Sequence, residues 1–129
     1  MNFVSIRIIT DDVARLVAFY EQASGLPATR YTEDFAELAT PSATVAIAGT
    51  RTVPPGFAQP GTNRNVIVEF LVEDVDALHR TLTGVLDELP DEPRTMPWGN
   101  RSLVVRDPDG NLVNFFTPVT PAARQKFGL

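Results

Sequence analysis

Few side chains in this sequence are equipped for chemistry. The chain has one histidine, His79, and no cysteine. Disulfides and thiolate metal sites are therefore excluded, and a histidine-rich metal centre or a Ser-His or Cys-His nucleophilic pair is disfavoured. His79 falls in a helical pattern, where a surface or packing histidine is the simpler interpretation. The main candidates are then two charged residues, Arg7 and Glu69, each inside an apolar strand-like run.

Arg7 and Glu69 occupy equivalent places in two similar stretches of the chain. One interpretation is that they form a buried or half-buried ion pair, because buried charges need partners. The other is that both contact a ligand, with Arg7 holding an anionic group and Glu69 a cationic or hydroxyl group. Glu69 is also the candidate general base, since a positioned carboxylate can take a proton from a substrate. These alternatives stay open at the level of the sequence.

The elements that position Arg7 are predicted from periodicity and capping residues. Residues 4–9 alternate as a strand does, and Asp11 or Asp12 then caps a helix that stops at Gly25. Three short strand-like runs follow, at residues 28–32, 35–39 and 44–48.

The same order of elements restarts in the second half of the chain. Residues 66–72 predict a strand and Asp74 caps a second helix. Three pairs of residues correspond at one fixed offset: Asp12 with Asp74, Val13 with Val75, and Leu16 with Leu78. A repeated unit of one strand, one helix and three strands explains this correspondence.

The repeat divides the 129 residues into segments. The first module spans residues 3–49 and the second spans residues 65–118, within a single domain. The connection at 50–64 is rich in proline and glycine, and acts as a linker or as a lid over a pocket. The tail at 119–129 is a short helix or frayed chain.

The strongest local signal is a turn near the end of the second module. Pro108 presets φ, Asp107 can bond back to the backbone, and Gly110 or Asn111 accepts a positive φ. Strand-prone runs at 102–105 and 112–116 flank this turn, which predicts a hairpin. The acidic segment 87–93 before it is expected to be a solvated strand edge or loop.

Charge and hydropathy narrow the classes of partner. The net charge of −5 argues against nucleic acid as a partner. No apolar run approaches the roughly 20 residues needed to span a bilayer, and no signal peptide is evident. We therefore expect a cytoplasmic protein with no membrane or nucleic-acid partner.

The order of elements resembles one superfamily, the vicinal-oxygen-chelate group of glyoxalase I, bleomycin-resistance proteins and extradiol dioxygenases. The features that carry the resemblance are the duplicated βαβββ unit, Ala18-Phe19-Tyr20 followed by Gly25-Leu26, and Trp98-Gly99 followed by Asp107-Pro108-Asp109-Gly110-Asn111. The resemblance covers roughly residues 3–118. It implies an α+β fold in which two βαβββ modules form curled mixed sheets around a shared cavity, often completed by a second subunit. A homodimer is therefore expected.

Catalytic members of that superfamily hold a divalent metal with histidine and glutamate side chains on the first and last strand of each module. By register, the resemblance places these positions at Ser5, Ile67, Ile47 and Asn114. A divalent ion of this class requires imidazole or carboxylate ligands, which none of these four residues supplies. We therefore expect no metal and no cofactor.

The strand phases and the resemblance together predict the lining of the cavity. It is apolar with a few convergent polar groups, as in small-molecule pockets generally. Trp98 is either a core aromatic or a stacking plate for a flat ligand at the cavity mouth. The candidate ligand-binding residues are Ser5, Arg7, Ile47, Ile67, Glu69, Trp98, Leu112, Asn114 and Phe116, beside which Val45, Ile9 and Leu71 share the predicted face.

The leading functional hypothesis is a metal-independent protein that sequesters an aromatic or amphiphilic compound, similar to the antibiotic-binding resistance proteins. Whether the chain is an enzyme is left open, with binding preferred. One alternative is an enzyme of the same superfamily, of lyase, isomerase or conjugating type, that uses Glu69 as base or an externally supplied metal. Another is a non-catalytic dimerising module whose cavity is filled by side chains.

Overall fold

The computed structural model describes residues 1–89 and 92–129. The chain forms two compact units, one of residues 1–64 with 107–110 and one of residues 65–106 with 111–129. The acidic segment predicted at 87–93 includes residues 90 and 91, which lie outside the described residues. In the described parts of the chain, none of the helices has the length and apolar character needed to cross a membrane.

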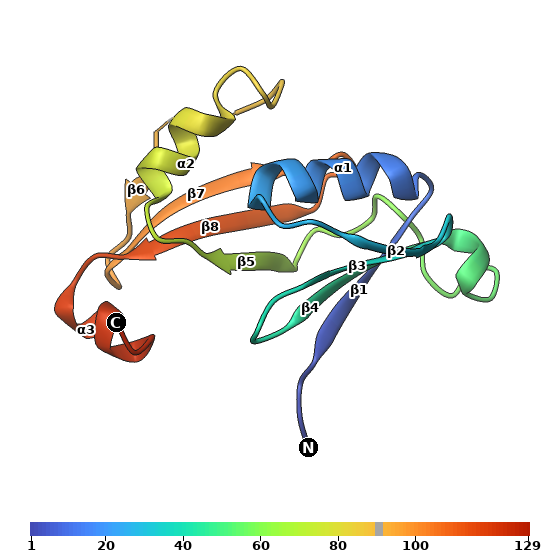
Figure 1. Cartoon of the computed structure of the whole chain (residues 1–129), viewed down its shortest axis with the longest axis horizontal. Coiled ribbons are helices and arrows are strands. Elements are labelled where there is room, and N and C mark those ends of the chain that lie inside the picture. Colours follow the sequence, from blue (N-terminus) through green and yellow to red (C-terminus); the bar gives the residue numbers. More distant parts are fainter. Residues whose placement is uncertain (90–91) are drawn as a thin grey trace. The chain divides into compact units, whose positions relative to one another are not determined.

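The first unit is a four-stranded mixed sheet with one helix (Figure 1). Its elements are β1 (Ser5–Thr10), α1 (Val13–Ser24), β2 (Thr29–Thr32), β3 (Phe35–Ala39), β4 (Thr44–Gly49) and the 3-10 turn η1 (Thr50–Thr52). The strand order is β1-β4-β3-β2, with β1 parallel to β4 and the other pairs antiparallel.

Helix α1 begins and ends where its capping residues predict. The Asp12 carboxylate accepts a hydrogen bond from the Arg15 amide at 3.1 Å, and Gly25 closes the helix with a φ of 72°. Leu16, Val17 and Tyr20 are buried, so α1 lays its apolar stripe on one face of the sheet.

The second unit repeats this architecture. Its elements are β5 (Ile67–Leu71), α2 (Val75–Leu82), β6 (Arg94–Thr95), β7 (Asn100–Arg106), β8 (Leu112–Pro118) and α3 (Pro121–Lys126). The strand order β5-β8-β7-β6 matches β1-β4-β3-β2, and β5 is again parallel to the last strand. The predicted α+β fold of two βαβββ modules is confirmed.

The hairpin of β7 and β8 also has the predicted turn. The Asp109 amide donates to Asp107 Oδ1 at 2.9 Å, the Gly110 amide donates to the Asp107 carbonyl at 2.9 Å, and Gly110 has a φ of 83°. The turn residues belong to the first unit, where the Tyr20 hydroxyl donates to Asp107 Oδ2 at 2.8 Å. A buried hydroxyl and a buried carboxylate thus satisfy each other.

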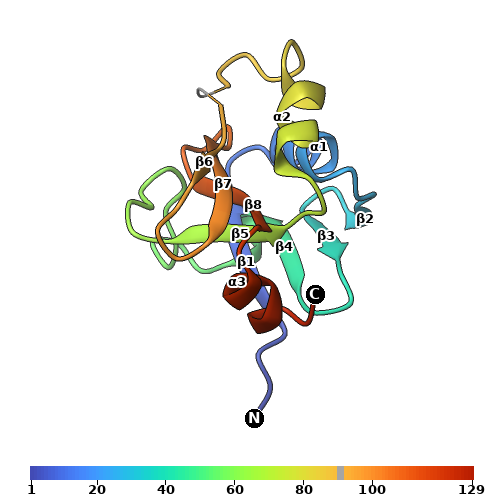
Figure 2. The ribbon, with the colours of Figure 1, turned by 90° about the vertical axis from the view of Figure 1, so that its left-hand side faces the viewer.

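The tail at 119–129 contains helix α3, which is the first of the two predicted alternatives, a short helix or frayed chain. Thr120 caps it by accepting a hydrogen bond from the Ala123 amide at 3.3 Å, and Pro121 occupies the first turn. In Figures 1 and 2, α2 and α3 lie on opposite sides of the second sheet. Phe127, at the end of α3, contacts Phe116 of β8 with ring centroids 5.3 Å apart.

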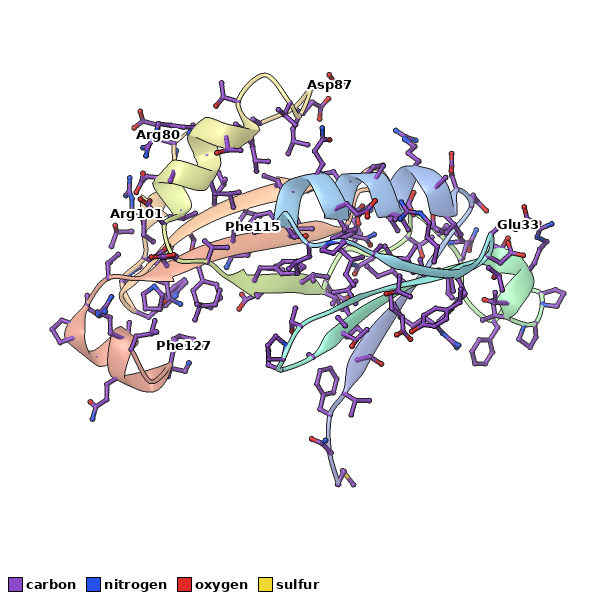
Figure 3. All side chains as sticks on the ribbon, viewed as in Figure 1. Glu33, Arg80, Asp87, Arg101, Phe115 and Phe127 are labelled. Atoms are coloured by element: carbon purple, nitrogen blue, oxygen red, sulfur yellow. The ribbon has the colours of Figure 1, made fainter. Side chains whose placement is uncertain are left out.

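An ion pair joins α2 to β7, and Figure 3 labels its arginine, Arg101. Arg101 Nε and a terminal guanidinium nitrogen donate to the two carboxylate oxygens of Asp76 at 2.6 and 2.9 Å. Both side chains are partly exposed, which limits the strength of the pair. The hydrogen bond from Arg101 lowers the pKa of the Asp76 carboxyl below its usual value of 3.8.

We expect a double-mutant cycle with Asp76→Ala and Arg101→Ala to give a coupling of about 0.2–1 kcal/mol, measured by urea denaturation. Because the pKa of Asp76 is lowered on folding, the coupling is present above pH 3.8 and is lost as the pH falls below it. Salt should weaken the coupling as well. Additive effects of the two substitutions at neutral pH and low salt would show that the ion pair does not contribute to the free energy of unfolding.

Candidate functional site

The best-defined candidate site is the face of the second sheet opposite α2. Side chains of neighbouring strands at paired positions share a face, and every second residue of a strand does so. The pairing of β5 with β8 and of β8 with β7 therefore places side chains in three rows that cross the three strands. We call this surface the open face; its rows are Ile67–Leu112–Arg106, Glu69–Asn114–Val104 and Leu71–Phe116–Ser102.

A polar pair lies at the centre of the open face. Asn114 Nδ2 donates to Glu69 Oε1 at 3.3 Å, which is longer than most hydrogen bonds of this kind. The Asn114 Oδ1 atom is buried and has no hydrogen-bond partner among the described residues. Glu69 itself is exposed. The open face therefore carries one exposed carboxylate next to an amide whose NH₂ group faces that carboxylate and whose oxygen is unsatisfied.

Apolar side chains surround the polar pair. Ile67 and Leu71 of the edge strand β5 are 46% and 45% exposed, and Val104 of β7 is 37% exposed, so three large aliphatic side chains are accessible on one face. Phe116, by contrast, is buried, and Phe127 of α3 contacts it. The open face therefore combines accessible hydrocarbon with two hydrogen-bond acceptors.

A hollow adjoins the open face on the β7 side. It has a volume of about 310 Å³, which is in the range of small-molecule pockets. Three of its lining residues, Val104, Arg106 and Leu112, belong to the open face. The connection after α2 supplies Glu88 and Leu89. Sequence reasoning assigned Glu88 to a solvated segment and did not single out Val104. The alternation of β7 was the signal that would have found Val104.

The predicted site residues divide between the two units. Ile67, Glu69, Leu112, Asn114 and Phe116 come together on the open face. Trp98 lies in the turn before β7 and is 67% exposed, which excludes the first of its two interpretations, a core aromatic. Its contact with a ligand stays a prediction.

In the first unit, Ser5 and Arg7 share a face of β1, and Arg7 is exposed. Ile47 and Val45 do not share that face. Ile47 pairs with Ile8, is fully buried, and lies on the α1 side of the sheet. The prediction that placed Val45 and Ile47 beside Arg7 is therefore wrong by one residue in the phase of β4.

The pairing corrects one of the four positions that the resemblance assigned to a metal ligand. Ser5 pairs with Thr44 as Ile67 pairs with Leu112, so the counterpart of Asn114, two residues on, is Ala46. A methyl group is no better a ligand than the side chain of Ile47.

The side chains at these positions do not fit a divalent metal. They offer a hydroxyl, a methyl group, a branched alkyl group and an amide, and the amide nitrogen of Asn114 is already directed at Glu69. Across residues 1–89 and 92–129, no three His, Asp or Glu side chains gather as a possible metal site. We therefore assign no step to a metal.

Comparison with known proteins gives the same fold. The family described as "Glyoxalase/Bleomycin resistance protein/Dioxygenase superfamily" matches residues 2–115. A glyoxalase/bleomycin resistance protein/dioxygenase family enzyme from Burkholderia phytofirmans PsJN has a TM-score of 0.78 at 19% identity, covering 92% of this chain and 100% of its own.

Two further solved structures share the fold. TioX from Micromonospora sp. ML1 has a TM-score of 0.70 at 22% identity, with coverage of 92% of this chain and 100% of TioX. Lactoylglutathione lyase from Agrobacterium tumefaciens has a TM-score of 0.67 at 18% identity, with coverage of 89% and 92%. No curated protein sequence matches the chain. Since the family match spans most of its length, the chain belongs to the glyoxalase/bleomycin resistance protein/dioxygenase superfamily.

Proposed function

We propose that this chain is a metal-independent protein that binds an aromatic or amphiphilic small molecule on the open face of its second sheet. The observation that carries the proposal is the Glu69–Asn114 pair surrounded by exposed Ile67, Leu71 and Val104. Exposed apolar surface with a few polar groups is the usual composition of a binding site. The adjoining hollow offers room for part of the bound molecule.

The residue types also support binding without a metal. The four positions assigned by the superfamily resemblance carry no imidazole or carboxylate. Binding, unlike catalysis, needs no group that stabilises a transition state. Shape, hydrocarbon contact and a few polar groups are sufficient.

We expect aromatic and amphiphilic compounds to raise the melting temperature of the protein in the presence of EDTA. A compound at 100 times its Kd adds about 2.7 kcal/mol to the free energy of unfolding. Leu71→Lys should abolish the shift, because it puts a charge in the apolar part of the open face. Val85→Lys is the matched control, since Val85 is 43% exposed and lies outside the open face.

Three results would contradict the proposal. They are the absence of any stabilising compound, equal stabilisation of Leu71→Lys and the parent, and stabilisation only by a divalent metal that EDTA reverses. Both variants alter exposed side chains, and circular dichroism would confirm that they fold.

The second candidate is a superfamily enzyme that uses Glu69 as base. The observation that favours it is the position of the carboxylate on the open face, next to the amide of Asn114. A stabilising compound incubated with the protein would then be converted, as followed by NMR over time. Conversion that stops in Glu69→Gln would favour the enzyme, and an unchanged compound would favour binding alone.

A further inference from the structure

The two acceptors at the centre of the open face define the polar group that they can bind. A carboxylate accepts hydrogen bonds and does not donate them, so the Asn114 amide must turn its NH₂ toward Glu69. The amide oxygen then points away and is left buried without a donor among the described residues. The hydrogen bond to Glu69 therefore sets the orientation of the Asn114 amide, although this orientation leaves the amide oxygen without a donor.

A ligand that supplies donors can bind the Glu69 carboxylate and, when the amide turns, the Asn114 oxygen as well. The bond between Asn114 and Glu69 is long, so the amide is held weakly and can turn its oxygen toward a new donor. Within the second unit, the described residues place no cation in ion-pairing distance of Glu69. The carboxylate is therefore open to a positively charged partner.

Resting on the proposed function, we propose that the bound molecule is an amphiphilic primary amine whose ammonium group sits between Glu69 and Asn114. An ammonium carries three donors and no acceptor, which matches the Glu69 carboxylate together with the Asn114 oxygen once the amide has turned. Hydrogen bonds between charged groups are roughly twice as strong as those between neutral groups. A carboxylate or phosphate would be repelled by Glu69, and an alcohol offers one donor only.

The surrounding residues favour an amine with a hydrocarbon body. Ile67 and Leu71 flank Glu69 on the same face of β5, and Val104 lies across from Asn114 on β7. Hydrocarbon on these sides lowers the local dielectric and strengthens the ion pair. Arg106, the one cation of the three rows, is in the neighbouring row. The net charge of −5 adds a general attraction for cations.

The test compares three compounds that share an aromatic body: 2-phenylethylamine, 2-phenylethanol and 3-phenylpropionate. Binding is followed in the full chain at neutral pH by ¹⁵N NMR titration of the open-face amides. We expect the amine to bind at least tenfold more tightly than the alcohol, and the carboxylate to bind more weakly than either. Glu69→Gln should weaken amine binding about tenfold or more and change alcohol binding by less than threefold, because only the amine uses the charge.

The matched control is Glu73→Gln, which removes the same charge from an exposed residue in the connection to α2. It should leave amine binding unchanged, which separates a specific contact from a general effect of net charge. Binding at the open face without preference for the amine, or an equal loss in Glu69→Gln and Glu73→Gln, would overturn the inference and leave the proposed function standing. No shift of any open-face amide with any of the three compounds would overturn both.

Discussion

Ile47→Ala is expected to lower the free energy of unfolding by about 2–5 kcal/mol, the range for removing a buried aliphatic side chain. Ile47 is fully buried on the α1 side of β4, between Ile8 of β1 and Ala36 of β3. Deleting its outer carbons leaves a space that the paired strands cannot close. The measurement is urea denaturation monitored by circular dichroism. The dependence of the unfolding free energy on urea concentration should be the same in the variant and the parent, which would exclude a change in the unfolded state.

Ile67→Ala is the matched control. Ile67 was predicted to line the same ligand site as Ile47, and the substitution removes the same atoms. Ile67 is exposed on the open face, so its loss should change stability by no more than about 1 kcal/mol. The same variant should weaken binding on the open face. Equal destabilisation by the two substitutions would mean that Ile47 does not lie in the core between sheet and helix.

The contrast between these two isoleucines shows what the sequence can and cannot reveal. The strand β5 alternates, with Val68 buried and Glu69 exposed, so its phase is readable from the residue types. The strand β4 is a continuous run of small and apolar residues that are almost all buried. After Thr44, no polar residue marks either face of the strand, and the pairing with β1 fixes the phase.

Elements with strong local signals were predictable. Asp12 and Asp74 cap the two helices through their own side chains, and the Asp107 turn is determined by residues two and three positions apart. The repeat then supplied the order of elements along the chain, one strand, one helix and three strands in each module. Local chemistry and duplication therefore account for most of the fold.

The site required information that local patterns do not contain. The bond between Glu69 and Asn114 joins residues 45 positions apart, and it depends on the register of β5 against β8. The hollow beside β7 depends on the path of the connection after α2, which has no periodicity to read. Trp98 is exposed because it lies in the turn before β7, where hydrophobicity alone suggested a core position.

The second large effect is expected at Tyr20. Tyr20→Phe should lower the free energy of unfolding by about 1.5–3 kcal/mol, the usual contribution of a hydrogen bond to a charged group. The Tyr20 hydroxyl is fully buried and donates to Asp107 Oδ2 at 2.8 Å. The phenylalanine ring fills nearly the same space, so the loss comes from a buried carboxylate deprived of that donor. Tyr31→Phe, at the exposed tyrosine, should change stability by less than about 0.5 kcal/mol.

The dependence on pH tests the cause of this loss. Burial, and then the negative charge of Asp107, raise the pKa of the Tyr20 phenol far above its ordinary value of 10.0. Above pH 10 the unfolded chain releases this proton while the folded chain keeps it. The contribution of Tyr20 to stability is therefore complete below pH 10 and falls by about 1.4 kcal/mol per pH unit above it.

Tyr20→Phe lacks this proton in both states, so its stability should decline less steeply than that of the parent above pH 10. The gap between the two proteins should then narrow as the pH rises, by about 1 kcal/mol from pH 10 to 11. Urea denaturation at pH 7, 9, 10 and 11 measures this difference directly. Parallel curves across that range would mean that the phenol ionises equally in both states, and that the bond to Asp107 does not hold its proton. A narrowing gap would show that the folded chain keeps the Tyr20 proton, as burial of the phenol beside the Asp107 carboxylate requires.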